Sequence, residues 1–226
     1  MPASKSHRPG RIMGILLLVQ LAGLIVPFIM MGAVATPDYL VTAAAAATPI
    51  RWALLLLLGN GVLTTALSIA LHPRLRTSSP ALSPWLIILG AGMVMLQASD
   101  NVHVMGMLSL SRAHVSDTLV AGPTLDVLGS WAAATRRTSH YLLLLAVGAW
   151  MIVFYSALWR ARLVPRVLAA FGVTAAALHI TGVSLPALLG VGSNPIMAMV
   201  LALSHPALAV RLIARGFDER TEERLT

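Results

Sequence analysis

Six long apolar runs dominate the 226-residue chain and constrain its fold more than any other feature. A membrane-spanning helix needs about 20 mostly apolar residues, and each of these runs approaches or exceeds that length. Backbone groups inside a bilayer must be satisfied within the segment, so the runs are predicted as helices and not as strands. The predicted spans are residues 12–34, 50–71, 85–110, 140–159, 164–185 and 195–214.

The composition agrees with this pattern and excludes several chemistries. Only 11% of the residues are charged, against about 25% in soluble domains. The absence of cysteine removes thiol catalysis, thiolate metal sites and disulfides. The single lysine, Lys5, precedes the first run, so no lysine Schiff base lies in the membrane. The sequence therefore predicts an all-α polytopic membrane protein, a bundle of six transmembrane helices that contacts the lipid bilayer.

Basic residues alternate between the two predicted sides of the membrane. One side holds Lys5, Arg8, Arg11, Arg74, Arg76, Arg160, Arg162, Arg166, Arg211, Arg215, Arg220 and Arg224. The other side holds Arg51, Arg112, Arg136 and Arg137. Because positive loops stay in the cytoplasm, both termini are predicted to be cytoplasmic. The acidic residues of the C-terminal tail make its charge mixed, and a nucleic-acid partner is not expected.

The one long loop, residues 111–139, faces outward in this topology. Within this loop a helical pattern begins at Pro123, a residue that suits a helix start, and it continues through Leu125, Leu128 and Trp131. The pattern predicts a short interfacial helix between helices three and four, lying on the outer membrane surface. A simple connector with a Trp anchor is the plainer interpretation, and a lid over an outward pocket is the functional one.

A polar stripe interrupts the third apolar run. Gln97, Asp100 and Asn101 share one helix face, and His103 follows Asp100 by three residues. An aspartate near the membrane centre costs about 2.5–3.5 kcal/mol on insertion scales, so this stripe is expected to face other helices and not lipid. Asp100 is the only acidic residue well inside a predicted span, which makes it the first candidate for function.

Depth along the predicted helices brings further polar residues near this stripe. Asp100, Asn101, His103 and His179 fall at similar depth, with His140 above them and Asn60 and His205 below. A polar cavity in the outer half of the bundle would accommodate all of them. Three interpretations remain open: structural hydrogen bonds between helices, a site for a small molecule or protons, and a site for a metal.

The first functional hypothesis is a pocket that binds or conducts a small molecule or protons, formed by Asp100, Asn101, Gln97, Asn60 and His205. The second is a redox protein that holds haem b or a divalent metal, because imidazole suits iron, copper and zinc. Its predicted metal ligands are His103, His179 and His140. The third is a non-enzymatic subunit of a larger membrane complex, or a homo-oligomer, in which the polar groups are structural.

Hydrolytic chemistry finds little support in the sequence. Ser204 and His205 are adjacent, so their side chains point in different directions on a helix. A single deeply placed aspartate cannot form a carboxylate dyad, and no glutamate lies in any predicted span. The sequence favours a protein that is not an enzyme, and no catalytic residue is assigned.

Two stretches resemble a known family. They are GRIMGILLLVQLAGLIV near the N-terminus and ARLVPRVLAAFGVTAAALHITG, in which a basic Leu-x-Pro-Arg element leads into a helix of small residues. Both are similar to bacterial membrane proteins of the family called domain of unknown function 4386. The resemblance covers nearly the whole chain. It implies a six-helix inner-membrane protein without an established activity, and it carries over no catalytic residue.

Overall fold

The computed structural model describes residues 7–116, 123–192, 194 and 196–218. Every regular element in this part of the chain is helical. The elements are α1 (His7–Met30), α2 (Gly32–Ala35), α3 (Tyr39–Thr42), α4 (Ala47–Leu75), α5 (Leu82–Ser116), α6 (Pro123–Ala161), α7 (Arg166–His179), a π-helical stretch η1 (Ile180–Ser184), α8 (Leu185–Leu188) and α9 (Ile196–Arg215). The prediction of an all-α protein is confirmed for the described residues.

Five apolar helices in the described residues are long enough to cross a membrane. They are residues 8–30, 47–75, 82–116, 123–161 and 166–188, the last formed by α7, η1 and α8 together. They contain the first five predicted spans apart from residues 31–34 of the first and residues 164–165 of the fifth. The helix α9 coincides with the sixth predicted span but is not among these five. The start of that span at Pro195 and the basic residues Lys5, Arg220 and Arg224 lie outside the described residues.

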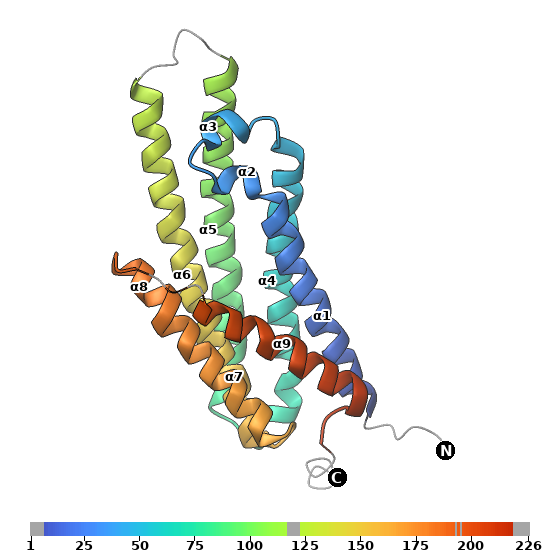
Figure 1. Ribbon diagram of the computed structural model, residues 1–226. Coiled ribbons are helices and arrows are strands. Elements are labelled where there is room, and N and C mark those ends of the chain that lie inside the picture. Colours follow the sequence, from blue (N-terminus) through green and yellow to red (C-terminus); the bar gives the residue numbers. More distant parts are fainter. Residues whose placement is uncertain (1–6, 117–122, 193, 195, 219–226) are drawn as a thin grey trace.

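The long helices form a ring in which each packs against the next along the chain. The contacts run from α1 to α4, α5, α6 and α7, then to α9, which closes the ring on α1 (Figure 1). The last turn of α9 returns to the first turns of α1, where Gly10 lies against the backbone of Gly216 and Phe217. The first described residues and the last therefore lie at the same end of the bundle.

The antiparallel register between α4 and α5 is constant over their shared length. The contacting pairs are Leu54 with Asn101, Gly61 with Val94, Thr65 with Gly90, and His72 with Ser83. In every pair the residue number falls on one helix by as much as it rises on the other. This register allows the height of any residue on α4 to be compared with residues on α5.

The segment expected to form a separate interfacial helix is instead the first part of α6. Pro123 begins a helix as expected, but the helix then continues without a break to Ala161. Residues 111–116, expected to be part of the loop, belong to α5. The two helices therefore form a long hairpin that extends beyond the ends of α7, α8 and α9 (Figure 1). A separate interfacial helix is not found among the described residues.

The short helices α2 and α3 join α1 to α4 beside this hairpin (Figure 1). Tyr39, at the start of α3, is 3% exposed, and its hydroxyl donates a hydrogen bond to the carbonyl oxygen of Gly129 on α6 at 2.9 Å. Burial raises the pKa of this phenol above its ordinary value, so it stays a neutral donor. The contact ties the α1–α4 connection to the hairpin.

Candidate functional site

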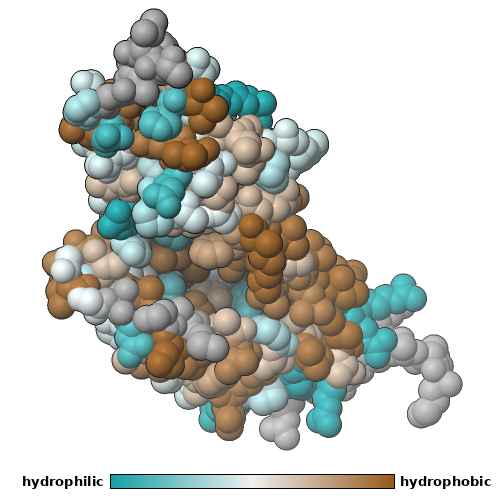
Figure 2. Space-filling model, turned by 45° about the horizontal axis from the view of Figure 1, so that its top comes forward, coloured by the Kyte–Doolittle hydropathy of each residue, from teal (hydrophilic) through white to brown (hydrophobic). Residues whose placement is uncertain are grey.

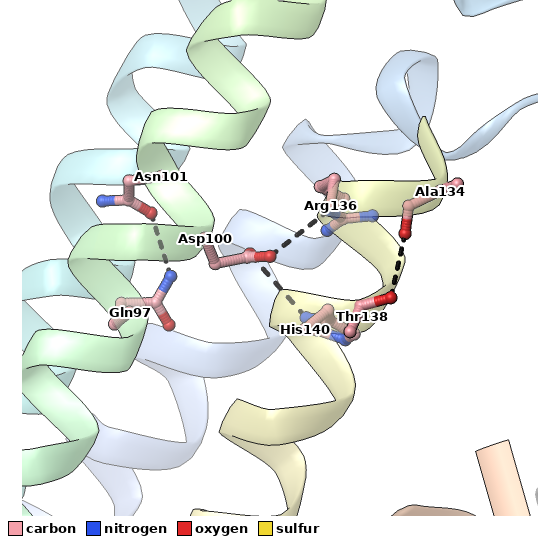
Figure 3. Close-up of polar contacts among 7 residues, drawn as sticks. All are labelled: Gln97, Asp100, Asn101, Ala134, Arg136, Thr138 and His140. Carbon is pink, nitrogen blue, oxygen red and sulfur yellow. Dashed lines mark hydrogen bonds and ion pairs between the residues drawn. The ribbon is translucent and has the colours of Figure 1, made fainter. Parts of the chain in front are cut away.

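Asp100 lies near the middle of α5 and is almost completely buried, with 1% of its surface exposed. Its carboxylate points across to α6, and Arg136 and His140 point back toward it from successive turns (Figure 3). Arg136 Nε lies 3.6 Å from Oδ1 of Asp100, and His140 Nδ1 lies 3.7 Å from Oδ2. Because Arg136 and His140 are four residues apart on a helix, one face of α6 presents both to the same carboxylate.

These contacts are ion pairs that fall short of hydrogen bonds. A hydrogen bond from N–H to oxygen spans about 2.7–3.2 Å, and both distances exceed that range. Asp100 Oδ1, Arg136 Nε and His140 Nδ1 are all buried atoms without a hydrogen-bond partner among the described residues. One carboxylate oxygen, one guanidinium nitrogen and one imidazole nitrogen therefore lie around the Asp100 side chain with their hydrogen-bonding capacity unused.

Gln97 and Asn101, which share this face of α5, are hydrogen-bonded, in contrast to Asp100. The Gln97 amide donates to Oδ1 of Asn101 at 2.9 Å, and the Asn101 amide donates to the Leu54 carbonyl of α4 at 2.9 Å. These bonds fix the α4–α5 contact directly behind Asp100. His103 lies further along α5, half-buried, and its Nδ1 has no hydrogen-bond partner among the described residues. The expectation that this stripe faces other helices is confirmed.

The charged cluster lies where the shorter helices stop covering α6. The imidazole of His179, the last residue of α7, lies 3.3 Å from the carbonyl of Leu144, one helical turn beyond His140 on α6. Arg136 and His140 keep 16% and 23% of their side-chain surface exposed, while Asp100 keeps 2%. Figure 2 shows a hollow on the face of the molecule that it draws, with hydrophobic side chains along its border.

A second buried polar cluster lies nearer the end of the bundle that holds the termini. Gln20 of α1 joins two helices, since its amide nitrogen donates to the Thr64 hydroxyl and its oxygen lies 3.3 Å from Nε2 of His205 on α9. Trp150 of α6 donates a hydrogen bond to the hydroxyl of Ser68 on α4 at 3.0 Å. Both hydroxyls in turn donate to α4 carbonyls one helical turn back. Most polar groups in this cluster have partners, so it links α1, α4, α6 and α9.

The structure thus divides the residues expected in one cavity between several places. Asp100 and His140 lie together, with Gln97 and Asn101 behind them. His205 belongs to the second cluster, and Asn60 lies beside Gly23 of α1. His140 is in contact with Asp100, at its height and not above it.

His179 is separate from the other two predicted metal ligands. Its Nε2 lies 3.3 Å from both the Leu144 carbonyl and the Ser184 hydroxyl. In the described part of the chain, no group of three or more His, Cys, Asp or Glu side chains is placed to hold a metal ion. The geometry therefore does not assemble the predicted ligand set His103, His140 and His179.

Arg136 is the main residue that the sequence did not assign to the site. It was placed among the basic residues of an external loop, whereas it lies within α6 against Asp100. The available signal was its spacing of four residues from His140, which puts two cationic side chains on one helix face. Gln20, Thr64, Ser68 and Trp150 of the second cluster carried no comparable signal.

Five apolar helices of spanning length, with a buried charged cluster between two of them, define a multi-pass helical membrane protein. The model of the family described as domain of unknown function 4386 matches residues 12–216, and the chain belongs to this family. Neither the curated proteins nor the solved structures contain a match to the chain.

Proposed function

We propose that this membrane protein binds a small polar molecule at the cluster of Asp100, Arg136 and His140. The observation that carries the proposal is the set of three buried polar atoms, one from each residue, that face one another without a hydrogen bond. Leaving a buried donor or acceptor unsatisfied costs about 1–3 kcal/mol, and more for charged groups. A ligand that supplied the missing hydrogen bonds would recover this cost on binding.

The contrast with the second cluster supports the same conclusion. Gln20, Thr64 and Ser68 make the hydrogen bonds expected of groups that hold helices together. The side chains at Asp100 are arranged in the opposite way, with opposite charges close together and their bonds unmade. Ionisable residues inside a membrane protein are rare and expensive, and they mark ligand or ion sites by default.

The exposed tryptophans support a placement of the cluster near one membrane surface. Trp85 and Trp159 lie toward the end that holds the termini, and Trp52 and Trp131 toward the other end, all with exposed side chains. The two levels are about 27 Å apart along α5 and about 42 Å apart along α6. The first value is close to the thickness of a hydrocarbon core, about 30 Å, and the second falls within that of a whole bilayer, about 40–45 Å. Asp100 then lies just inside the level of Trp52.

We further propose that both termini are cytoplasmic and that the charged cluster opens toward the outer surface of a cytoplasmic membrane. The basic residues near the ends of α1, α4, α6 and α9 support this orientation. The chain has no cysteine, so single cysteines report topology without background. A membrane-impermeant maleimide should label Val115→Cys in intact cells, and Ser78→Cys only after permeabilisation. The reverse labelling pattern would contradict the orientation.

The binding site is tested by replacing the whole charged set with apolar residues. Exchanging a buried ion pair for well-packed apolar side chains is neutral or stabilising by about 1–4 kcal/mol, whereas removing one partner costs about 3–5 kcal/mol. The triple variant Asp100→Leu, Arg136→Met, His140→Leu should therefore match or exceed the wild-type Tm in detergent. The single variant Asp100→Leu, which leaves Arg136 unpaired, should fall well below it.

The same proteins are then screened for thermal stabilisation by small polar compounds. A compound that raises the Tm of the wild type and leaves the triple variant unchanged supports binding at this cluster. A triple variant that is much less stable than the wild type, together with a wild type that no compound stabilises, shows that the cluster is structural. Co-purification of other subunits with the wild type would then favour a role as a structural membrane partner.

A further inference from the structure

We infer that the ligand of this cluster is a small zwitterion, a molecule that carries an ammonium group and an oxyanion a few bonds apart. This inference rests on the proposed function, because it names the chemical class of the ligand at the same site. It starts from the signs of the charges and from which hydrogen-bonding atoms are unused. Asp100 offers an unpartnered carboxylate oxygen, and Arg136 offers an unpartnered Nε–H.

A ligand with one charge fits this arrangement poorly. A simple cation that approached Asp100 would meet the guanidinium of Arg136, whose Nε lies 3.6 Å from the same carboxylate. A simple anion that approached Arg136 and His140 would meet the carboxylate of Asp100. In a medium of low dielectric these repulsions are strong, and a net charge is costly to bring in.

A zwitterion turns both repulsions into attractions. Its ammonium group bonds to Asp100, and its oxyanion bonds to Arg136 and to a protonated nitrogen of His140. Both charged groups of the ligand must still leave water, and their ion pairs with Asp100 and Arg136 offset this desolvation cost. Each unused atom of the cluster then acquires a charge-assisted hydrogen bond, the stronger kind in proteins.

The position of the cluster limits the size and the source of this zwitterion. Only Arg136 and His140 reach the surface, with 16% and 23% of their side chains exposed, so the ligand must be small. Two sources share the required chemistry. One is a free amino acid from the aqueous side, and the other is the phosphoethanolamine headgroup of a lipid, because the cluster lies near the level of Trp52.

The test measures thermal stabilisation of the purified protein in detergent by whole zwitterions and by their halves. The zwitterionic probes are glycine, β-alanine and glycerophosphoethanolamine, the soluble phosphodiester form of the lipid headgroup. The half-ligands are ethanolamine and inorganic phosphate, and glycolamide is a neutral compound of similar size. At a hundredfold excess over Kd, a bound ligand should raise the Tm by about 5–10 °C. At least one zwitterion should do so, and the half-ligands should have little effect.

Variants locate the effect at the cluster. Asp100→Asn and Arg136→Gln each remove one of the two opposite charges, so each should abolish the shift. Asp126→Asn is the matched control, because Asp126 is exposed near the start of α6, and it should keep the full shift. If Asp100→Asn is too unstable to purify, Arg136→Gln alone still decides whether the oxyanion half is recognised.

A comparison of lipids separates the two sources. Stabilisation by glycine or β-alanine in lipid-free detergent indicates an amino acid ligand. Stabilisation by phosphatidylethanolamine and not by phosphatidylglycerol, with no effect of the free amino acids, indicates a lipid headgroup. Equal stabilisation by phosphate or ethanolamine alone overturns the inference, as does the absence of a shift with every zwitterion. If glycolamide stabilises the wild type but not Asp100→Asn, the binding site stands and its zwitterionic specificity falls.

Discussion

Close packing of α1 against α9 makes Gly14 a sensitive position. A Cβ atom at Gly14 would lie 2.7 Å from the carbonyl oxygen of Ala209 and 2.8 Å from Cγ1 of Ile213. Favourable contacts between carbon atoms lie at about 3.5–4.0 Å, so α9 would have to move away by roughly 1 Å. The first obstacle is backbone, which cannot rotate aside as a side chain does. Overpacking of this kind costs about 1–3 kcal/mol.

The variant Gly14→Ala is best compared with Gly92→Ala, because a Cβ at Gly92 would meet nothing within 4 Å. Both changes gain the same helix propensity, about 1 kcal/mol, which cancels in the comparison. The remaining difference of about 2 kcal/mol corresponds to about 4–8 °C in Tm for a chain of this size. Thermal unfolding in detergent, followed by circular dichroism, measures it. Equal Tm values for the two variants would refute the packing of α9 on α1.

Two further contacts give predictions of the same kind. Ser68→Ala removes the acceptor of the buried Trp150 indole and should cost about 1–3 kcal/mol, but much less when it is introduced into Trp150→Phe. Tyr39→Phe removes the hydrogen bond to Gly129 and should cost about 1 kcal/mol at neutral pH. Because burial raises the Tyr39 pKa above its ordinary value of 10.0, this stabilisation is present below pH 10 and declines above it. The Tm difference between the wild type and Tyr39→Phe should shrink accordingly in alkaline buffer.

The sequence was sufficient to predict helices because long apolar runs have few alternatives in a bilayer. The predicted span 85–110, for example, lies within α5. The same argument could not show where α6 begins. Residues 123–139 contain several polar side chains, so the apolar pattern starts only at His140, whereas the helix starts at Pro123. Hydropathy reports what a segment contacts, and it does not report how far its helix continues past the membrane.

The candidate site was predicted in part for a similar reason. Asp100 stood out because an acidic residue in an apolar run is costly, and this cost can be read from one segment alone. Its pairing with Arg136 depends on the register between α5 and α6, which only the packed structure provides. The positive-inside rule uses each arginine only as a marker of the side of the membrane, so it assigns Arg136 to an external loop. His140 was expected above Asp100 because residue 140 is the start of the predicted span. The helix in fact begins at Pro123, and His140 lies level with Asp100.

Gln20 offers a decisive comparison between the two polar clusters. It is the hydrogen-bond partner of His205 Nε2, and His205 is only 7% exposed. Gln20→Met keeps the side-chain length but leaves the imidazole without that partner, which should cost about 1–3 kcal/mol. Adding His205→Leu removes the imidazole that has lost its partner, so the double variant should recover most of the loss in Tm.

Recovery of this kind identifies a structural link between helices, because an apolar contact then replaces a polar one at little cost. The double variant should also keep any ligand-induced rise in Tm that the wild type shows, since its changes lie away from Asp100. If the two losses simply add, His205 has a stabilising role that does not pass through Gln20. If the ligand-induced rise disappears in the double variant, His205 contributes to the binding site, as the sequence alone suggested, and the separation of the two clusters is wrong.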